Sequence, residues 1–335
     1  MILKMQIVKT AADLPGEWDG AVKDYFQTRE FLTHTEKYNP CDQRYYTFCN
    51  DNSFVAGLVV YTLKLDLFTY SFIRCPLSMN IGGLPCSVSS SGFIGKPEFL
   101  VQVINQVKTK EKGFLVILNL AVRPEMQDVM IGNTLPTIIF DNEFRSWNSY
   151  IGSLKSEYRR RIKRSAEQFG SVIKNRGDCT LFTKAMYKLY LAVLDHSKGK
   201  LETLTYNFFH QLPERFSLTA FHFEDNLLGW YISVSHENQF YFFLGGINYK
   251  LNDKFKTYSN LLQDLLEEGI RLNRTIIDLG QTAEISKIRL GGKIKVKWMV
   301  AHHSKWLFRK LLNTSRKILE YSEKFPVNHV FKDKQ

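Results

Sequence analysis

An acidic residue lies inside a segment that otherwise has the composition of a buried strand, and a short basic segment follows it. Residues 276–292 are IIDLGQTAEISKIRLGG, in which Asp278 stands among isoleucine and leucine and is followed by Lys287 and Arg289. A carboxylate in a buried strand costs free energy unless it is paired or hydrogen-bonded. Because a positioned carboxylate or amine can also take a proton from a substrate, the segment predicts acid–base chemistry.

Each polar side chain of this segment has a candidate role. We expect Asp278 to act as a base or as the electrostatic anchor of an amine, and Lys287 to stabilise an oxyanion or bind an anionic group. Gln281 is a candidate for substrate contact, and Arg289 for binding a phosphate or carboxylate of the substrate. The alternative is structural: Asp278 pairs with Lys287 or caps a turn, and the basic residues are solvated.

The distribution of charge indicates an anionic partner for the second half of the chain. The net charge is +12, with 14 Lys and Arg against 15 Asp and Glu up to residue 148, and 31 against 18 after it. A phosphate-bearing cofactor, a nucleic acid or an anionic membrane surface would each complement this charge. Charge alone does not choose among them.

Two basic helices are expected in that half. In the first, RRRIKRSA at residues 159–166, the basic side chains form a solvated face, or Arg159 and its neighbours contact phosphates. The second, near residues 306–325, combines Trp306, leucines and isoleucine with lysine and arginine. It is expected to pack on the domain, and a membrane-surface helix is the alternative.

Composition predicts a folded chain without a bilayer span or a metal site. Hydrophobic residues make up 44% of the sequence, and every long apolar segment is broken by charges. The N-terminus lacks a signal-peptide core, and five cysteines without a C-x-x-C pair indicate reduced thiols, so we expect a cytoplasmic protein, with contact at the inner face of the membrane as a possibility. The adjacent His302 and His303 lack a third ligand at metal spacing. The five cysteines are Cys41, Cys49, Cys75, Cys86 and Cys179.

The order of elements predicts a duplicated α/β domain. The first half is expected to hold a strand, two helices, three strands, a helix, a strand, a short helix near Glu125 and a strand, with the third central strand at residues 68–77. The second half repeats this plan, with a long helix at residues 258–273, a strand at 275–279 and a short helix. Thr282 is expected to cap the short helix, and Gly291 to end it.

This order resembles the GNAT acyltransferase fold, and two such units in one chain resemble the FemAB-like peptidoglycan aminoacyltransferases. The junction carrying RRRIKRSA is similar to the R-x-x-I-[KR]-[KR]-A helix of that group, with one extra residue. The closing segment is similar to its D-x-G-x…K-x-R-[FL]-G signature. The matching positions are Asp278, Gly280, Lys287, Arg289, Leu290 and Gly291.

The resemblance implies a donor site beside the long helix. In the GNAT arrangement, Gly245 and Gly246 would end the strand that faces the acyl carbonyl with unpaired amides. The usual Q/R-x-x-G-x-G/A pyrophosphate turn is missing. Phosphates would be held by lysines before the helix and by amides at its start, which are Lys254, Lys256, Thr257 and Tyr258. The implied donor is acyl-CoA, used as a co-substrate and not permanently bound.

Together these observations predict a two-unit N-acyltransferase in which an amine attacks an activated acyl donor directly. Residues 1–148 are expected to form a non-catalytic unit, 149–304 the catalytic unit, and 305–335 a basic helix and tail. The acceptor would be a small-molecule, lipid or peptidoglycan-precursor amine, with a role in the bacterial cell envelope. One alternative is an aminoacyl-tRNA-dependent ligase of the Fem type, and another is a non-catalytic binding module of the same fold.

Overall fold

The structure is a computed structural model of the 335-residue chain, and it describes residues 3–51, 53–66, 76–86, 88–197 and 202–332. Most of the strand expected at residues 68–77, together with Cys75, lies outside the described residues. The other four cysteines are free thiols. No helix in the described part is both long and apolar enough to cross a lipid bilayer.

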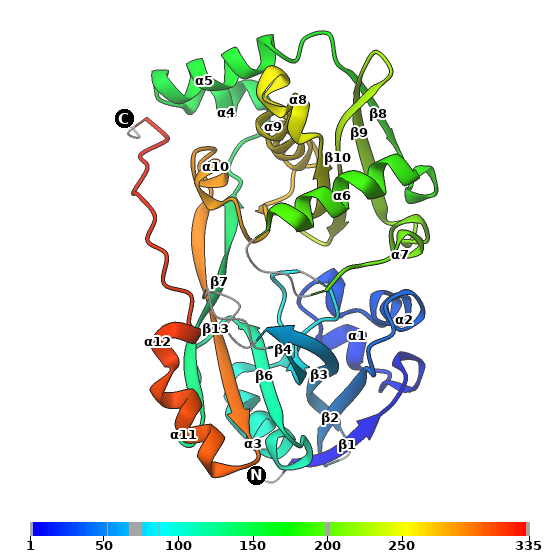
Figure 1. Cartoon of the computed structure of the whole chain (residues 1–335), viewed down its shortest axis with the longest axis vertical. Coiled ribbons are helices and arrows are strands. Elements are labelled where there is room, and N and C mark those ends of the chain that lie inside the picture. The colour runs from blue at the N-terminus through cyan, green and yellow to red at the C-terminus, as the bar shows by residue number, and fades with distance from the viewer. Residues whose placement is uncertain (1–2, 52, 67–75, 87, 198–201, 333–335) are drawn as a thin grey trace. The chain divides into compact units, whose positions relative to one another are not determined.

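Two compact units make up the chain, and each is built from three separate segments. Unit 1 comprises Met1–Pro136, Lys198–Phe208 and Val296–Glu323, and unit 2 comprises the remainder. Two long strands, β7 (Met130–Asp141) and β13 (Lys293–His303), contribute residues to both units (Figure 1). The units are therefore not the consecutive segments 1–148 and 149–304 expected from the sequence, because each long strand begins in one unit and ends in the other.

Unit 1 is a mixed sheet with one long helix across it. The strands follow the hydrogen-bonded order β1-β2-β3-β4-β6-β13, and β5 pairs with β3. All neighbours are antiparallel except β4 and β6, which are parallel and are connected through α3. The elements are β1 (Lys4–Val8), η1 (Ala11–Asp13), α1 (Trp18–Ala21), η2 (Tyr25–Gln27), α2 (Arg29–Tyr38), β2 (Arg44–Asn50), β3 (Ser53–Asp66), β4 (Pro76–Gly82), β5 (Phe93–Gly95), η3 (Pro97–Phe99), α3 (Leu100–Lys110), β6 (Phe114–Leu120), α11 (Trp306–Thr314) and α12 (Arg316–Leu319).

The core of unit 1 forms because α3 places apolar residues at helical spacing over a strand surface. Leu100, Val103, Ile104 and Val107 of α3 pack on buried residues of β2, β3 and β6. The helix expected near Glu125 is absent, and the helix expected before residue 23 is only the single turn α1.

Unit 2 repeats this plan, in the order β7-β12-β11-β10-β9-β8. Here the parallel pair is β11 and β12, and the crossover between them contains α8 and α9. Its elements are α4 (Trp147–Ser153), α5 (Ser156–Glu167), β8 (Ile173–Gly177), η4 (Cys179–Leu181), α6 (Lys184–His196), α7 (Tyr206–His210), which begins in unit 1, β9 (Phe216–Phe223), β10 (Asn226–His236), β11 (Gln239–Ile247), α8 (Tyr249–Phe255), α9 (Thr257–Arg271), β12 (Ile276–Asp278) and α10 (Glu284–Ile288).

Helices cover both faces of the unit 2 sheet, because successive side chains of β10 contact different helices. Trp230 donates its indole N–H to the Met186 carbonyl of α6 at 2.9 Å, whereas the Tyr231 hydroxyl donates to Asp264 of α9 at 2.7 Å. Successive strand residues point to opposite faces, so α6 and α9 lie on opposite sides (Figure 1). This packing fixes β11 and its neighbours between two helices.

Candidate active site

The parallel strands β11 and β12 part after three residue pairs. Gln239, Phe240 and Tyr241 pair with Ile276, Ile277 and Asp278, and β12 then ends while β11 continues to Ile247. Beyond β12 the chain follows β7 instead, since the Leu279 amide donates to the Ile138 carbonyl at 2.9 Å. The later part of β11 therefore has a ladder with β10 only, and alternate backbone groups point away from β10 along its other edge. We call this edge, which has no partner strand among the described residues, the opening.

A bulge in β11 lies at the start of this opening. Ile232 of β10 pairs with Leu244 and Ser233 pairs with Phe242, so Phe243 is an extra residue in the ladder. A bulge bends and twists its strand. This irregularity occurs immediately after the last pair with β12, at the point where the two strands part.

Asp278 ends β12 at the point of divergence and is 7% exposed. Its Oδ1 atom accepts hydrogen bonds from Thr137 Oγ1 at 2.8 Å and from the Gly280 amide at 2.7 Å. Two donors on one oxygen compensate the burial of a carboxylate and fix its orientation. Asp278 is thus an oriented carboxylate at the end of β12, whereas the sequence predicted it inside a strand at residues 275–279.

Lys287 on α10 is a buried cation beside this carboxylate. Its side chain is 1% exposed, its Nζ donates to the Gln281 carbonyl at 2.7 Å, and it lies 5.7 Å from the centre of the Phe242 ring. Burial lowers the pKa of Lys287 to about 7, while the negative charges of Asp278 and Glu284 act to raise it. An amine with such a pKa can exchange protons near neutrality.

The turn between β12 and α10 is strained. Gly280, Thr282 and Ala283 have φ values of 76°, 61° and 50°, in the left-handed region that only glycine adopts without cost. Thr282 does not cap α10 as predicted; the residue before the helix is Ala283, and no side chain caps it. Helix α10 ends at Ile288 with Arg289 as its C-cap, so Gly291, at φ 95°, lies in the turn that follows and not at the helix end as predicted. Strained residues of this kind persist where the surrounding structure over-determines them, and they cluster at functional sites.

Three residues that the sequence did not indicate contribute to this cluster. Thr137 of β7 bonds Asp278, the Phe242 ring lies beside Lys287, and Glu284 is an acid only 8% exposed whose charge raises the pKa of Lys287. Glu284 could have been found, since it precedes Lys287 by three residues and shares its helix face. Thr137 and Phe242 lie far from both in sequence and carry no local signal.

The structure brings together some of the predicted residues and separates others. Asp278, Gln281 and Lys287 lie within one turn-and-helix segment, and Gln281 acts on Lys287 through its carbonyl. Arg289, directly after α10, is exposed, and Arg159 on α5 is exposed as well. The last two are available to a ligand in solution but are not parts of the buried cluster.

The two glycines of β11 have packing reasons for being glycine. A Cβ on Gly246 would lie 2.5 Å from the Trp230 indole nitrogen, and one on Gly245 would lie 2.9 Å from the Trp230 carbonyl. Both residues also lie in the part of β11 beyond its pairing with β12. A structural role and a role in the opening are therefore compatible at these positions.

The predicted phosphate site at the start of α9 is partly occupied by the chain itself. The segment expected to be a loop contains the helix α8, and the Lys256 amide donates to the Asn252 carbonyl at its end. The Tyr258 amide donates to Asn252 Oδ1 at 3.0 Å, so it is already satisfied. Thr257 is buried, and its Oγ1 has no hydrogen-bond partner among the described residues.

The lysines beside this helix start are exposed. Lys256 lies 3.7 Å from Asp253, and Lys254 lies 5.5 Å from the ring centre of Phe223 and 5.0 Å from that of Phe255. The lysine side chains are therefore accessible to a phosphate here, whereas the backbone amides of Lys256 and Tyr258 already donate to Asn252.

A second buried cluster lies in unit 1, where the Arg44 guanidinium and the Tyr46 hydroxyl both donate to the Glu111 carboxylate. None of the predicted site residues belongs to it.

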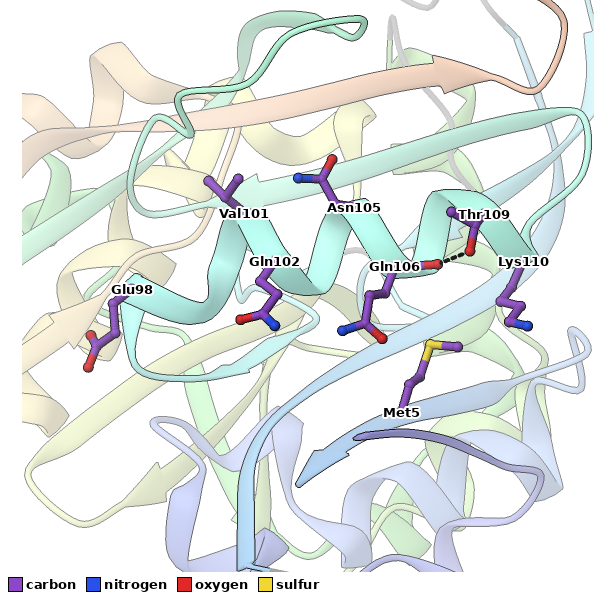
Figure 2. A pocket seen from close by; sticks show the side chains of 8 residues that line it. All are labelled: Met5, Glu98, Val101, Gln102, Asn105, Gln106, Thr109 and Lys110. Atoms are coloured by element: carbon purple, nitrogen blue, oxygen red, sulfur yellow. Dashed lines mark hydrogen bonds between the residues drawn. The ribbon is translucent and has the colours of Figure 1, made fainter. Parts of the chain in front are cut away.

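No three His, Cys, Asp or Glu side chains among the described residues are arranged to hold a metal ion. His302 and His303 are buried on β13, and His303 Nδ1 accepts from the Lys305 amide at 2.9 Å. Figure 2 shows an open hollow in unit 1, where polar side chains of α3 lie near Met5 of β1; none of the predicted site residues lines it.

Comparison with known proteins identifies the fold. No protein-family model matches the sequence, and no curated protein matches it significantly. Among solved structures, FemX is similar over 92% of this chain and 100% of its own, with a TM-score of 0.58 and 10% identity. L-PGS from Bacillus licheniformis has a TM-score of 0.49 and 10% identity, over 86% of this chain and 96% of its own. A tandem GNAT protein from the clavulanic acid biosynthesis pathway has a TM-score of 0.49 and 8% identity, over 90% and 99%.

The similarity to FemX concerns the fold. It spans nearly the whole of both chains at low identity. The mixed α/β fold of two units, shared with FemX, is thereby confirmed.

Proposed function

We propose that this chain is an N-acyltransferase, which moves an acyl group from an activated donor to an amine by direct attack. The proposal rests on one observation: the buried Lys287 interacts electrostatically with Asp278 at the point where β11 and β12 part. The fold shared with FemX supports an activity of the acyltransferase type.

The reaction requires three things of the protein. The amine nitrogen must attack the acyl carbon in its neutral form, a donor must stabilise the oxygen that becomes negative, and the attacking nitrogen must lose a proton. A C–N bond forms, the C–S or C–O bond to the leaving group breaks, and the leaving group takes up a proton. No covalent intermediate with the enzyme is needed.

Lys287 is proposed to carry the proton. With a pKa of about 7, its neutral form can accept a proton from the attacking nitrogen, and the resulting ammonium can return it to the leaving group. The Gln281 carbonyl holds Nζ at 2.7 Å, so the group is oriented before substrate binds. Burial supplies the altered pKa, and burial also strengthens each electrostatic interaction that Nζ makes.

Asp278 is proposed to anchor the substrate amine and to maintain the charge balance of the site. Its Oδ1 already accepts from Thr137 and Gly280. Successive amides of a strand point to opposite edges, so the Gly245 amide faces away from β10 whereas the Gly246 amide faces β10. The Gly245 amide is proposed to receive the acyl carbonyl.

Acyl-CoA is the donor that the sequence resemblance favours. With the Tyr258 and Lys256 amides committed, its phosphates would bind through the side chains of Lys254 and Lys256 and not through a cradle of bare amides. Thr257 would contribute its unpartnered hydroxyl if the start of α9 opened.

An aminoacyl-tRNA is the second candidate donor, and the exposed positive charge of α5 favours it. Its outer surface carries five exposed cations for which the described part of the chain records no ion pair, namely Arg159, Arg160, Arg161, Lys163 and Arg164. Because nucleic-acid affinity depends on neutralising phosphates, such a surface suits an RNA backbone. A small cofactor needs fewer cations.

The activity is tested by amide formation with a panel of amines, in which a peptidoglycan-precursor amine is the first acceptor to try. Replacing Lys287 or Asp278 with alanine should lower turnover at least about tenfold while circular dichroism stays native. Lys293→Met, at an exposed lysine close to α10 in sequence, is the matched control and should keep its turnover. Unchanged turnover in both site variants would remove the assignment. The absence of transfer to any amine would favour a binding module.

The donor is tested by binding. Acyl-CoA should raise the melting temperature, and Lys254→Glu with Lys256→Glu should abolish that shift. Charged tRNA, if it is the donor, should bind with an affinity that falls steeply with salt, and Arg159→Glu with Arg160→Glu should weaken it. Stabilisation by tRNA alone would identify the second candidate.

A further inference from the structure

The outer surface of α11 and α12 in unit 1 exposes large apolar side chains at helical spacing. Leu307, Leu311 and Ile318 are 61%, 54% and 47% exposed, and Trp306 is 66% exposed. Positions separated by four, seven and eleven residues lie on one side of a helix, so the two leucines and the isoleucine form a single stripe. We call this stripe, with Trp306, the α11 face.

The adjacent side of the same segment, one residue further along at each position, accounts for its attachment to unit 1. Phe308 packs against Phe114 and His303, with ring centres 5.9 and 4.5 Å away, and Leu312 and Leu319 are buried. The segment therefore already has an apolar side that contacts the domain. The α11 face is a second apolar surface, which a helix that merely packs on a domain does not need.

Cations border this surface. The sequence from 304 to 319 contains Lys305, Arg309, Lys310, Arg316 and Lys317 and no acidic residue. Arg316 pairs with Glu320 at 3.1 Å, whereas no ion pair is recorded for Lys310 or Lys317 among the described residues. Both lysines are exposed, and their helical positions lie between Trp306 and the leucine stripe.

From this pattern we infer that the α11 face binds an anionic lipid surface, with its apolar side chains at the acyl boundary and its lysines at the headgroups. An apolar stripe bordered by basic residues is what an interfacial helix requires, because it gains from both burial and electrostatic attraction. A second copy of this chain would bring two sets of cations together, and that costs free energy. A nucleic acid would match the lysines but would leave the leucines in water.

This inference does not depend on the proposed reaction, because α11 contains no residue of the candidate active site. The test uses the full chain and vesicles of phosphatidylcholine alone or mixed with phosphatidylglycerol. The protein should sediment with the mixed vesicles only, and added salt should weaken the binding. The fluorescence emission should shift to the blue on binding, and Trp306→Phe should remove the shift, since Trp306 is highly exposed.

Paired variants separate the two contributions. Leu307→Ser with Leu311→Ser should lower the partition into mixed vesicles by about tenfold or more, because two apolar side chains no longer enter the bilayer. Lys310→Glu with Lys317→Glu should have a similar effect through charge. The matched controls are Ile173→Ser, at an exposed isoleucine of β8, and Lys4→Glu with Lys9→Glu, and they should bind as the wild type does.

Several outcomes would overturn the inference. These are no binding to mixed vesicles, equal binding to phosphatidylcholine alone, or equal losses in the controls and in the α11 variants. Concentration-dependent dimerisation that Leu307→Ser with Leu311→Ser abolishes would identify a second copy as the occupant. Acyl transfer to a water-soluble amine should be unchanged in the α11 variants, so failure of this inference and failure of the proposed function give different results.

Discussion

Each unit contains a pair of parallel strands joined through three residue pairs, but the two strand pairs end differently. In unit 1, β4 pairs with β6 through three residues, and β4 stops at Gly82, where the last pair is with Ile117. In unit 2, β11 also pairs with β12 through three residues but continues to Ile247, and its last pair is with Asp278. In both units one strand outlasts its parallel partner, β6 in unit 1 and β11 in unit 2, so the units differ in which strand continues and in the side chain at the last pair.

The side chain at the last pair accounts for much of the difference. Ile117 is fully buried and packs so closely on Gly82 that a Cβ there would lie 2.7 Å from its Cγ1. The next residue, Gly83, donates its amide to Val59 of β3, so the chain stays attached to its antiparallel neighbour. Strand β6 also continues past this pair, to Leu120, but Asn119 in that stretch already donates to the Val88 carbonyl at 2.8 Å. Unit 1 therefore presents an apolar side chain where unit 2 presents Asp278, which supports the proposal that unit 2 carries the chemistry.

The largest expected effect comes from forcing unit 1 to resemble unit 2. Ile117→Asp should lower the free energy of unfolding by roughly 3–5 kcal/mol, because it buries a charge without partners. Urea denaturation measures this, and Ile117→Val is the matched control, with an expected cost of about 1 kcal/mol. A loss below about 1 kcal/mol for the aspartate would mean that unit 1 has room for a charge, and the contrast between the units would fail.

The pH dependence of turnover should follow the ionisation of Lys287. If neutral Lys287 accepts the proton, kcat falls about tenfold per pH unit below its pKa of about 7 and levels off above it. Lys287→Arg, which stays charged, should abolish this inflection and lower kcat. A wild-type profile that is flat between pH 5 and 8 would exclude Lys287 as the base.

The stability of the chain should also depend on pH through Lys287. The unfolded state holds this proton up to the usual pKa of 10.5, whereas the folded state releases it near 7, so stability rises with pH above 7. The slope should reach at most about 1.4 kcal/mol per pH unit. Urea unfolding between pH 7 and about 7.5 keeps the contribution of the buried thiols small, because unfolded cysteine loses its proton only near pH 8.5. Lys287→Met should flatten the curve, and an unchanged slope in that variant would place the proton release elsewhere.

The smallest effect is expected at Thr137. Thr137→Val removes one donor to Asp278 while keeping side-chain volume, and it should cost about 1 kcal/mol of stability and a few-fold in turnover. Thr134→Val, at another buried threonine of β7, is the comparison variant. Equal turnover in the wild type and in Thr137→Val would mean that the Gly280 amide alone positions the carboxylate.

Local sequence patterns predicted much of the fold. The apolar spacing of Leu261, Leu262, Leu265, Leu266 and Ile270 predicted the long helix almost as it occurs in α9. The strand holding Asp278 and the short helix holding Lys287 were also expected, because an acid amid isoleucines followed by a glycine turn is a local feature. The match to FemX then confirmed the two-unit fold.

Where prediction differed from structure, contacts between distant segments decided the outcome. Helix α8 occupies a segment that looked like a loop, and Asn252 uses its side chain to bond the Tyr258 amide that was expected to be free. Thr282 looked like a helix cap, but the turn holds it at positive φ. Such outcomes depend on how the whole turn packs and not on the propensity of one residue.

The sequence by itself therefore determined which residues could do chemistry and which secondary structures carry them, because periodicity and residue type act over a few positions. Only the tertiary structure decided that Lys287 is buried beside Asp278, that β11 outlasts its parallel partner, and that β7 and β13 contribute to both units. The physical reason is that desolvation and strand pairing are set by groups brought together from distant parts of the chain.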